Sequence, residues 1–477
     1  MTKQDTEIQR ISQYFGFAPT QDQETAIRHL AAFGLSIKPN PLYLLKGYAG
    51  TGKTSLISAF VNNLHHQGRK FVLLAPTGRA AKVLSQYTGF QAHTIHRKIY
   101  HSVLQKDGRR KMVTAVNRVQ NTVFIIDEAS MISDYSQDQG TMSGGDSLLD
   151  DLISFVFMLN GNRLLLVGDT AQLPPVGLGL SPALDVDYLK SAFNLTAFSF
   201  EMTQVMRQAL DSGILTSATL LREKINSEDT AAPFFFQKNF HLDVQIIEDG
   251  YMLEELMQTA FAGRGEVDSI VVTRSNKTAN QYNQQIRRQI QQRESNLEAG
   301  DEIMVVKNNY FWLDEGSKAG FIANGDLAEV LRVNKLEEIY GFHFAEAEIR
   351  LIDYPEEKEL RVKLLLDSLD APGPSISADD RQRLFDEIER DYQSIPNRRK
   401  RIAEMQKDPY FNALHIKFAY AMTCHKTQGG QWPVVFVEQG YLNEELLNIE
   451  YLRWLYTAFT RATSKVYLLN FNADFFG

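Results

Sequence analysis

A glycine-rich segment directly after an apolar run is the clearest chemical motif in the chain. Residues 47–54 read Gly-Tyr-Ala-Gly-Thr-Gly-Lys-Thr, which fits the spacing GxxxxGK followed by Ser or Thr. Such glycines let successive backbone N–H groups turn toward phosphate oxygens, and the helix that follows adds its positive N-terminus. We expect the nucleotide to be bound by Gly47, Ala49, Gly50, Thr51, Gly52, Lys53, Thr54 and Ser55. The alternative is a glycine-rich turn with a chance lysine, which the strand before the segment and the helix after it disfavour.

Two adjacent carboxylates close the apolar run 123–126. A carboxylate such as Asp127, at the end of a strand, can reach a metal ion through water, and Glu128 can orient or deprotonate the attacking water. An acidic pair after a strand is by itself more often a solvated loop. Combined with the glycine-rich segment, the pair favours nucleotide hydrolysis over nucleotide binding alone, with Mg²⁺ held by Thr54 and Asp127.

The elements that must position these groups alternate strands with helices. Apolar runs without polar alternation are typical of strands that are buried on both faces of a parallel sheet. Such runs occur at 42–46, 71–75, 123–127 and 163–169, and helical stretches such as 55–67 lie between them. The pattern predicts the α/β class with an open parallel sheet.

Two stretches interrupt the first unit. Between 94 and 122, two strand-like runs flank Asp107-Gly108, which favours an inserted β-hairpin. Residues 134–146 are polar and rich in glycine, as is typical of a loop.

A second set of apolar strands, at 269–273, 434–438 and 466–470, predicts a second α/β unit. The wide gap between the first two of these strands indicates an insertion. Within the gap, alternating runs at 301–311 and 326–335 are typical of a small barrel, and 377–406 is charged with a helical period.

The amino-acid composition limits which classes of protein the chain can belong to. The chain has 477 residues, 44% hydrophobic and 23% charged, as in an ordinary globular protein of roughly three domains. A single cysteine, Cys424, excludes internal disulfides and paired-cysteine zinc sites. No apolar run reaches the roughly 18 residues of a membrane span, and no signal-peptide pattern opens the chain, so we expect a cytoplasmic protein without a membrane partner. The net charge of −8 argues against a uniformly basic nucleic-acid binder, although a locally basic channel does not need one.

Seven further motifs follow the glycine-rich segment in order: 75–84, 94–97, 127–130, 168–177, 204–208, 420–432 and 456–462. The most specific are the segments GDTAQLPPVG, HKTQG and AFTRA. With these motifs, the chain resembles the superfamily 1 DNA helicases of the RecD-like and Dda-like branch, and the resemblance spans about residues 18 to 470.

The resemblance implies further roles at the nucleotide. Gln23 is similar to the family's adenine-reading glutamine, and an exposed glutamine at a helix start is the alternative. Gln172 resembles a γ-phosphate sensor. Arg207 and Arg461 resemble two arginine fingers from the second lobe, which add to Lys53, Asp127 and Glu128 as catalytic residues; a surface salt bridge is the alternative for either arginine. Gln431 stands where the family often has a glutamate that contacts the nucleotide sugar. Met206 stands where phenylalanine is usual.

The resemblance also implies contacts with the DNA backbone. In the first lobe they would come from Pro76, Thr77 and Gly78, and in the second from His425, Lys426 and Thr427. His96 would either contact the strand or cap a packed turn. Trp432 and Phe459 fit a core or an interface between lobes better than base stacking.

The implied fold is a pair of RecA-like lobes with parallel sheets. The first covers 1–198 with a β-hairpin insertion at about 98–120, and the second covers 199–298 and 415–477. An SH3-like barrel with a charged helical projection fills 299–414, longer than the minimal barrel of the RecD-like type.

The implied activity is an ATP- and Mg²⁺-dependent DNA helicase that moves 5′→3′ on single strands and opens forked DNA, with the hairpin as wedge. Proteins of repair or recombination are possible partners. Two alternatives stay open: a non-unwinding single-strand binding or remodelling module, and an ATPase subunit of a helicase–nuclease complex. The residues do not separate DNA from RNA.

Overall fold

The computed structural model describes residues 2–104, 110–134, 147–205, 212–230, 243–262, 269–314, 317 and 319–476. Asp107-Gly108, most of the polar loop 134–146, Met206 and the predicted arginine finger Arg207 therefore lie outside the described residues. No helix in the described ranges is both long enough and apolar enough to cross a membrane.

The first lobe is built on a parallel sheet with strand order β3-β2-β6-β7-β1-β8. Its strands are β1 (Pro41–Gly47), β2 (Phe71–Ala75), β3 (Ala92–Thr94), β6 (Val123–Ile126), β7 (Arg163–Gly168) and β8 (Thr196–Met202). Successive side chains of β1 enter different cores: Tyr43 and Leu45 pack with one set of helices, and Leu42 and Leu44 with another. Both faces of the sheet are therefore covered, which explains why the apolar runs do not alternate.

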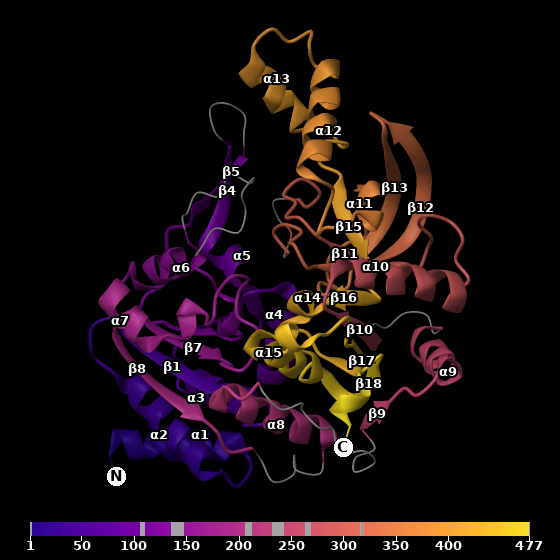
Figure 1. The fold of residues 1–477 in the computed structure, drawn as a ribbon. Coiled ribbons are helices and arrows are strands. Elements are labelled where there is room, and N and C mark those ends of the chain that lie inside the picture. The colour runs from indigo at the N-terminus through magenta and orange to yellow at the C-terminus, as the bar shows by residue number, and fades with distance from the viewer. Residues whose placement is uncertain are drawn as a thin grey trace.

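Helices cover both faces of this sheet (Figure 1). The core that contains Tyr43 is formed with α1 (Lys3–Phe15), α2 (Gln21–Leu35), α3 (Lys53–His66) and α4 (Gly78–Thr88). The other core uses α5 (Ile95–Ile99), α6 (Leu148–Phe157) and α7 (Val186–Phe193). Short 3-10 turns lie at Ala129–Met131 and Pro182–Leu184.

The second lobe repeats the plan with the parallel order β16-β10-β17-β18-β9. The strands are β9 (Val244–Ile246), β10 (Ser269–Thr273), β16 (Ala421–Thr423), β17 (Trp432–Glu438) and β18 (Ala462–Leu469). The helices are α8 (Gly213–Ser227), α9 (Gly250–Phe261), α10 (Asn276–Gln285), α14 (Cys424–Thr427) and α15 (Ile449–Phe459). A π-helical turn, Ile286–Ile290, continues α10, and 3-10 turns lie at Glu444–Leu446 and Ala473–Phe475.

A closed barrel of β11-β12-β13-β14-β15 separates β10 from β16. Its strands are β11 (Glu302–Val305), β12 (Leu327–Ile339), β13 (Phe342–Leu351), β14 (Leu360–Leu365) and β15 (Leu414–Phe418). The helices α11 (Asp367–Asp370), α12 (Ala378–Asp391) and α13 (Arg398–Met405) lie between β14 and β15, and α12 and α13 form the predicted charged projection.

A hairpin of β4 (Tyr100–Leu104) and β5 (Arg110–Thr114) leaves the first lobe after α5. The second strand is shorter than the sequence pattern indicated, since it ends at Thr114. At the base of the hairpin, Tyr100 donates a hydrogen bond to Asp151 Oδ2 (2.7 Å) and Thr114 donates one to Asp151 Oδ1 (3.2 Å). In Figure 1 the hairpin and α12–α13 extend toward the same side of the molecule.

The predicted α/β class, the two parallel sheets, the hairpin and the barrel are confirmed. Two predicted boundaries fall inside strands. The one at 198 cuts β8, which pairs with β1 along its whole length, and the one at 414 cuts β15, which pairs with β11 in the barrel. Strands end where their ladder ends, so the breaks belong after Met202 and after Phe418.

Candidate active site

The glycine-rich loop connects β1 to α3 at the carboxyl edge of the first sheet. Gly50 (φ 76°) and Gly52 (φ 86°) take the left-handed conformation, which lets the loop turn its backbone inward without a Cβ penalty. Thr54 and Ser55 are half-buried in the first turn of α3. The loop therefore has the shape that the sequence predicted for a phosphate cradle.

The ammonium group of Lys53 is held by the loop itself. Its Nζ donates to the carbonyl oxygens of Gly47 (2.5 Å) and Tyr48 (2.9 Å), and lies 3.8 Å from Asp169 Oδ2. Thr51 is fully buried, and its hydroxyl donates to the Tyr48 carbonyl (2.8 Å). The cation is thus poised over the loop and bonded to neutral carbonyls that a phosphate can replace.

Asp127 and Glu128 follow β6, which is a neighbour of β7 in the same sheet. Burial, together with the neighbouring Glu128 carboxylate, raises the pKa of Asp127 to about 7. Glu128 has φ 53°, a left-handed conformation that is rare outside glycine, and its N–H donates to Asp127 Oδ1 (2.9 Å). Backbone strain of this kind gathers at functional sites, which supports the predicted role of this pair.

A third acidic residue, Asp169, lies beside Lys53 and was not among the residues predicted from the sequence. Lys46 pairs with Gly168 in the β1–β7 ladder, so the ends of these strands bring the loop 47–52 next to Asp169. Asp169 is 1% exposed, and its Oδ1 accepts the N–H of Ala171 (2.9 Å). Gln172, the predicted phosphate sensor, is buried in the same segment, and its Oε1 has no hydrogen-bond partner. That unpaired oxygen can accept a hydrogen bond from a water molecule or another donor, but not from a phosphate oxygen, which is itself an acceptor.

Helix α15 of the second lobe inserts into this corner. The Tyr456 hydroxyl donates to Asp169 Oδ2 (2.6 Å) and accepts the N–H of Ala49 (2.8 Å). One turn earlier, Arg453 donates to the carbonyls of Thr170 and Gln172. Tyr456 lies in the motif that suggested Arg461, but its partners are remote in sequence, and only the fold could identify them.

Gln23 is 1% exposed, so it is not the exposed helix-start glutamine of the alternative reading. Its Oε1 accepts the Thr20 N–H (2.9 Å) in a capping box at the start of α2, and its Nε2 donates to the carbonyl of Thr51 (3.0 Å). Both ends of the amide are therefore used, and reading adenine would require Gln23 to exchange these partners. In this structure it braces the glycine-rich loop.

Arg461 is buried and forms its hydrogen bonds within its own lobe. Its guanidinium donates to the carbonyls of Thr457 (3.1 Å) and Gly430 (3.2 Å) and to the hydroxyl of Thr460 (3.3 Å). To act as an arginine finger, Arg461 would have to break these hydrogen bonds.

Gln431, the residue predicted at the nucleotide sugar, is exposed. Its Oε1 accepts a hydrogen bond from the Tyr87 hydroxyl of α4 at 3.4 Å.

The predicted DNA segment of the first lobe lies at the start of α4. Pro76 and Thr77 directly follow β2, and the Thr77 hydroxyl caps the helix by accepting the Ala80 N–H (3.2 Å). Gly78 is buried against the barrel, because a Cβ there would lie 2.8 Å from Asp326 Oδ1 and 2.9 Å from the Tyr354 hydroxyl.

The predicted DNA segment of the second lobe forms α14. Lys426 donates to Asn324 Oδ1 (2.6 Å), and burial lowers the pKa of His425. Thr427 is fully buried, and its hydroxyl donates to the Cys424 carbonyl (2.8 Å), so this side chain does not face a strand in this conformation. In the first lobe, the His96 ring lies 5.7 Å from the Tyr100 ring at the foot of the hairpin.

Trp432 and Phe459, which we predicted to lie in a core or at an interface between lobes, are both buried. Trp432 is 1% exposed beneath the Arg79 guanidinium of the first lobe, and Phe459 is fully buried. The contact brings the start of α4 against the loop before β17. The two lobes therefore meet in two places. One is the corner formed by Lys53, Asp169 and Tyr456, which we call the nucleotide corner. The other lies between the two predicted DNA segments.

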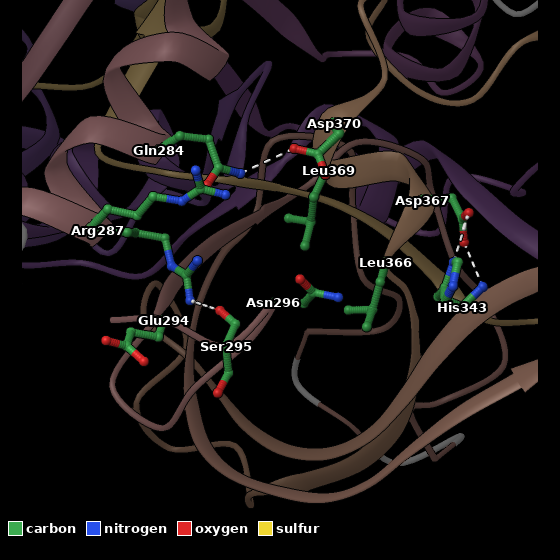
Figure 2. A pocket seen from close by; sticks show the side chains of 11 residues that line it. Gln284, Arg287, Glu294, Ser295, Asn296, His343, Leu366, Asp367, Leu369 and Asp370 are labelled. Carbon is green, nitrogen blue, oxygen red and sulfur yellow. Dashed lines mark hydrogen bonds and ion pairs between the residues drawn. The ribbon is translucent and has the colours of Figure 1, made fainter. Parts of the chain in front are cut away.

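A cavity of about 330 Å³ lies elsewhere, between α10, its π-helical turn and the barrel (Figure 2). It is lined by polar groups, among them His343, which bonds Asp367 (3.3 Å), and Gln284, which bonds Asp370 (3.0 Å). None of the residues predicted for the nucleotide or for DNA lines it. It is separate from the site described above.

Two family models match the chain: "AAA domain" over residues 18–232 and "UvrD-like helicase C-terminal domain" over residues 418–469. The ATP-dependent RecD2 DNA helicase of Deinococcus radiodurans is 26% identical over 89% of this chain and 46% of its own length. The ATP-dependent DNA helicase dda of Enterobacteria phage T4 is 25% identical over 56% of this chain and 56% of its own length. The chain thus spans about half the length of these two relatives.

Among solved structures, the Pif1 helicase of Candida albicans covers 96% of both chains at 16% identity and a TM-score of 0.39. A Pif1 structure described as unwinding forked double-stranded DNA covers 96% of this chain and 94% of its own at 14% identity and a TM-score of 0.47. The two family models and the ordered motifs agree that the chain is similar to the superfamily 1 helicases of the RecD-like and Dda-like branch.

Proposed function

We propose that the chain is an ATP- and Mg²⁺-dependent DNA helicase that moves along single strands and opens forked duplexes. The observation that carries the proposal is the nucleotide corner. Lys53, Asp169 and Tyr456 come from a glycine-rich loop, a strand end and the second lobe, and they meet within hydrogen-bond or ion-pair distance. A phosphate bound beside Lys53 would change these contacts, and the change would reach both lobes.

The groups present suit ATP with Mg²⁺. Backbone N–H groups of the loop and Lys53 would bind the phosphates, the Thr54 hydroxyl and the Asp127 carboxylate would hold the metal, and Glu128 would position water. When bound, Mg²⁺ would neutralise phosphate charge. The unpaired Oε1 of Gln172 can accept a hydrogen bond from a water molecule on this side of the loop. Arg461 and Arg207 remain the proposed fingers.

Two protein segments that are predicted to contact DNA lie on opposite sides of the boundary between the lobes. This arrangement supports stepping along a strand. The segment Pro76–Gly78 and helix α14 belong to different lobes, and Arg79 and Trp432 hold them together. Opening and closing at the nucleotide corner would alternately change the spacing of these segments. The proposed direction, 5′→3′, rests on the family resemblance, and the RecD2 and dda relatives are named DNA helicases.

Strand displacement by the purified chain tests the proposal. With ATP and Mg²⁺, the chain should separate a fork that carries a 5′ single-stranded tail and leave a 3′-tailed fork intact. DNA-stimulated ATPase without displacement would instead support a remodelling module or a subunit that needs partners from repair or recombination. An RNA-tailed fork of the same sequence decides between the two nucleic acids. A cytoplasmic location also remains a prediction, which fractionation of cells would test.

A further inference from the structure

The Tyr456 hydroxyl occupies a position between two groups of the first lobe that both belong to the nucleotide corner. It donates its proton to Asp169 Oδ2 (2.6 Å) and accepts the N–H of Ala49 (2.8 Å). Burial and the Asp169 carboxylate raise the pKa of Tyr456 well above its ordinary value, so the hydroxyl keeps the proton that it donates. At 1% exposure, water cannot replace either partner without opening the contact between the lobes.

The same carboxylate oxygen serves two groups. Asp169 Oδ2 accepts from Tyr456 and lies 3.8 Å from Lys53 Nζ. A phosphate in the loop attracts Lys53, because an ammonium group interacts more strongly with phosphate than with the carbonyls of Gly47 and Tyr48. Asp169 then loses a cation and depends on the tyrosine hydroxyl, and a hydrogen bond to a buried carboxylate becomes stronger when a competing cation leaves.

The helix that carries Tyr456 also contacts the predicted DNA segment of its own lobe. The carbonyl of Trp454 in α15 accepts from the Cys424 thiol of α14 (3.5 Å). From the other side, Gln428, which follows α14, donates to the carbonyl of Leu173 in the first lobe (2.7 Å), and the Leu173 N–H donates to Thr457 of α15 (2.9 Å). A shift of α15 against Asp169 therefore moves the contacts that hold α14.

We propose that Tyr456 is a positioning residue that couples the occupancy of the nucleotide loop to the grip of α14 on DNA, through its hydrogen bonds to Asp169 and Ala49. The proposal rests on the proposed function and names the contact by which the two lobes respond to each other. It assigns no chemistry to Tyr456. Its hydroxyl transmits the position of Lys53 and Asp169 to the second lobe.

The chain offers a matched control on the same helix. Tyr451 is also 1% exposed, but its hydroxyl accepts from Gln439 Nε2 (3.3 Å) within the second lobe. Tyr456→Phe and Tyr451→Phe each remove one buried hydroxyl from α15 and keep the ring. Only the first removes a bond between the lobes. Asp169→Asn keeps the size of the side chain and removes its charge, so it weakens the same bond from the first lobe and also removes the ion pair with Lys53.

The experiment measures ATPase of the full chain with and without saturating single-stranded DNA, and the affinity for that DNA with and without a nonhydrolysable ATP analogue. We expect Tyr456→Phe to bind analogue and DNA separately within about threefold of the parent, yet to lose about tenfold or more of the DNA stimulation, as is typical of lost coupling between sites. Tyr451→Phe should keep the stimulation. If the bond between Tyr456 and Asp169 carries the effect, Tyr456→Phe combined with Asp169→Asn should lose no more of the stimulation than Asp169→Asn alone.

The outcomes separate the two proposals. A parent chain whose ATPase ignores DNA overturns the proposed function and this coupling together. A parent chain that responds to DNA, with a folded Tyr456→Phe variant that responds equally, overturns only the role of Tyr456. Equal losses in both tyrosine variants would show a general packing effect and would also overturn that role. If Tyr456→Phe does not fold, Asp169→Asn decides by its DNA stimulation relative to its own ATPase without DNA, because this variant also changes the contact with Lys53.

Discussion

The guanidinium of Arg79 lies 3.9 Å from the centroid of the Trp432 ring, across the boundary between the lobes. The same guanidinium donates to the carbonyl of Gln431 (3.0 Å). Arg79 follows Gly78 in the first predicted DNA segment, and Trp432 follows closely on the second. This stack therefore sets the distance between the two segments that we propose to contact the backbone of one strand.

Removing the stack should loosen the grip on DNA. In Arg79→Ala, the loss of a cation–π contact on a buried ring, worth about 1–2 kcal/mol, should weaken single-stranded DNA binding by about five- to thirtyfold. Arg79→Lys separates charge from geometry, because it keeps the cation but lacks the planar group that stacks and donates to Gln431. Fluorescence anisotropy with a labelled strand measures both variants. If Arg79→Ala binds single-stranded DNA with the affinity of the parent, the contact between Arg79 and Trp432 does not position the strand.

Gly78 is expected to tolerate no side chain. A Cβ there would lie 2.8 Å from Asp326 Oδ1 and 2.9 Å from the Tyr354 hydroxyl, so Gly78→Ala should push α4 and the barrel apart. We expect lower DNA affinity and a lower melting temperature, equivalent to about 1–3 kcal/mol of overpacking. Gly179→Ala is the control, since open space surrounds that glycine and its backbone is unstrained. Equal behaviour of the two variants would contradict the close contact.

The sequence predicted the elements that carry a local pattern, such as a continuous apolar run or a motif. It did not predict the elements and contacts that depend on how distant parts of the chain pack together. Apolar runs located β1, β2, β6, β7 and β10, because burial on both faces leaves no polar alternation. β8 escaped because it is an edge strand of mixed, half-buried residues. The motif order identified Lys53 and Arg461. It could not pair Tyr456 with Asp169, which are 287 residues apart, since only the packing of α15 on the first lobe brings them together.

If Glu128 positions the attacking water, replacing it should reduce ATP turnover and leave ATP binding unchanged. Glu128→Gln keeps the shape and the Asp127 carboxylate but removes the group that positions water. ATP should bind normally, while turnover falls by about a hundredfold or more, as is common when a general base is lost. Lys53→Ala should instead lose affinity and turnover together. Equilibrium binding of a fluorescent ATP analogue and steady-state ATPase provide the two readouts. Parental turnover in Glu128→Gln would remove this glutamate from the mechanism.

Asp326 should make stability depend on pH. Burial raises the pKa of Asp326 to about 8 from the ordinary value of 3.8, and the nearby Asp353 carboxylate adds to the effect. The folded state therefore keeps the proton while the unfolded state releases it above about pH 4. The stabilising contribution is complete below that pH and is lost as the pH rises through about 8.

Asp326→Asn isolates this contribution, because it keeps the size of the side chain and cannot ionise. Relative to this variant, the parent should lose stability between about pH 5 and pH 8.5, by an amount on the order of 1–3 kcal/mol. Urea unfolding of both proteins at the two pH values measures the difference. An equal pH dependence in the two proteins would show that the Asp326 carboxyl group ionises freely in the fold.

The hairpin β4–β5 provides the sharpest test of strand separation. Tyr100 and Thr114 anchor its base to Asp151 of α6, so a replacement that spares both residues leaves the lobe intact. We therefore replace residues 102–112 with a short Gly/Ser link. A two-stranded projection adds little core of its own, so the melting temperature should hardly change. DNA-stimulated ATPase and single-strand translocation should also persist, since the glycine-rich loop and both DNA segments are untouched. Duplex unwinding should fall sharply, because nothing would separate the strands at the junction.

Asp151→Asn, which weakens the anchor and keeps the hairpin, should give an intermediate loss. Parental unwinding by the trimmed protein would place the separator elsewhere, most directly in the projection formed by α12 and α13, which extends toward the same side of the molecule.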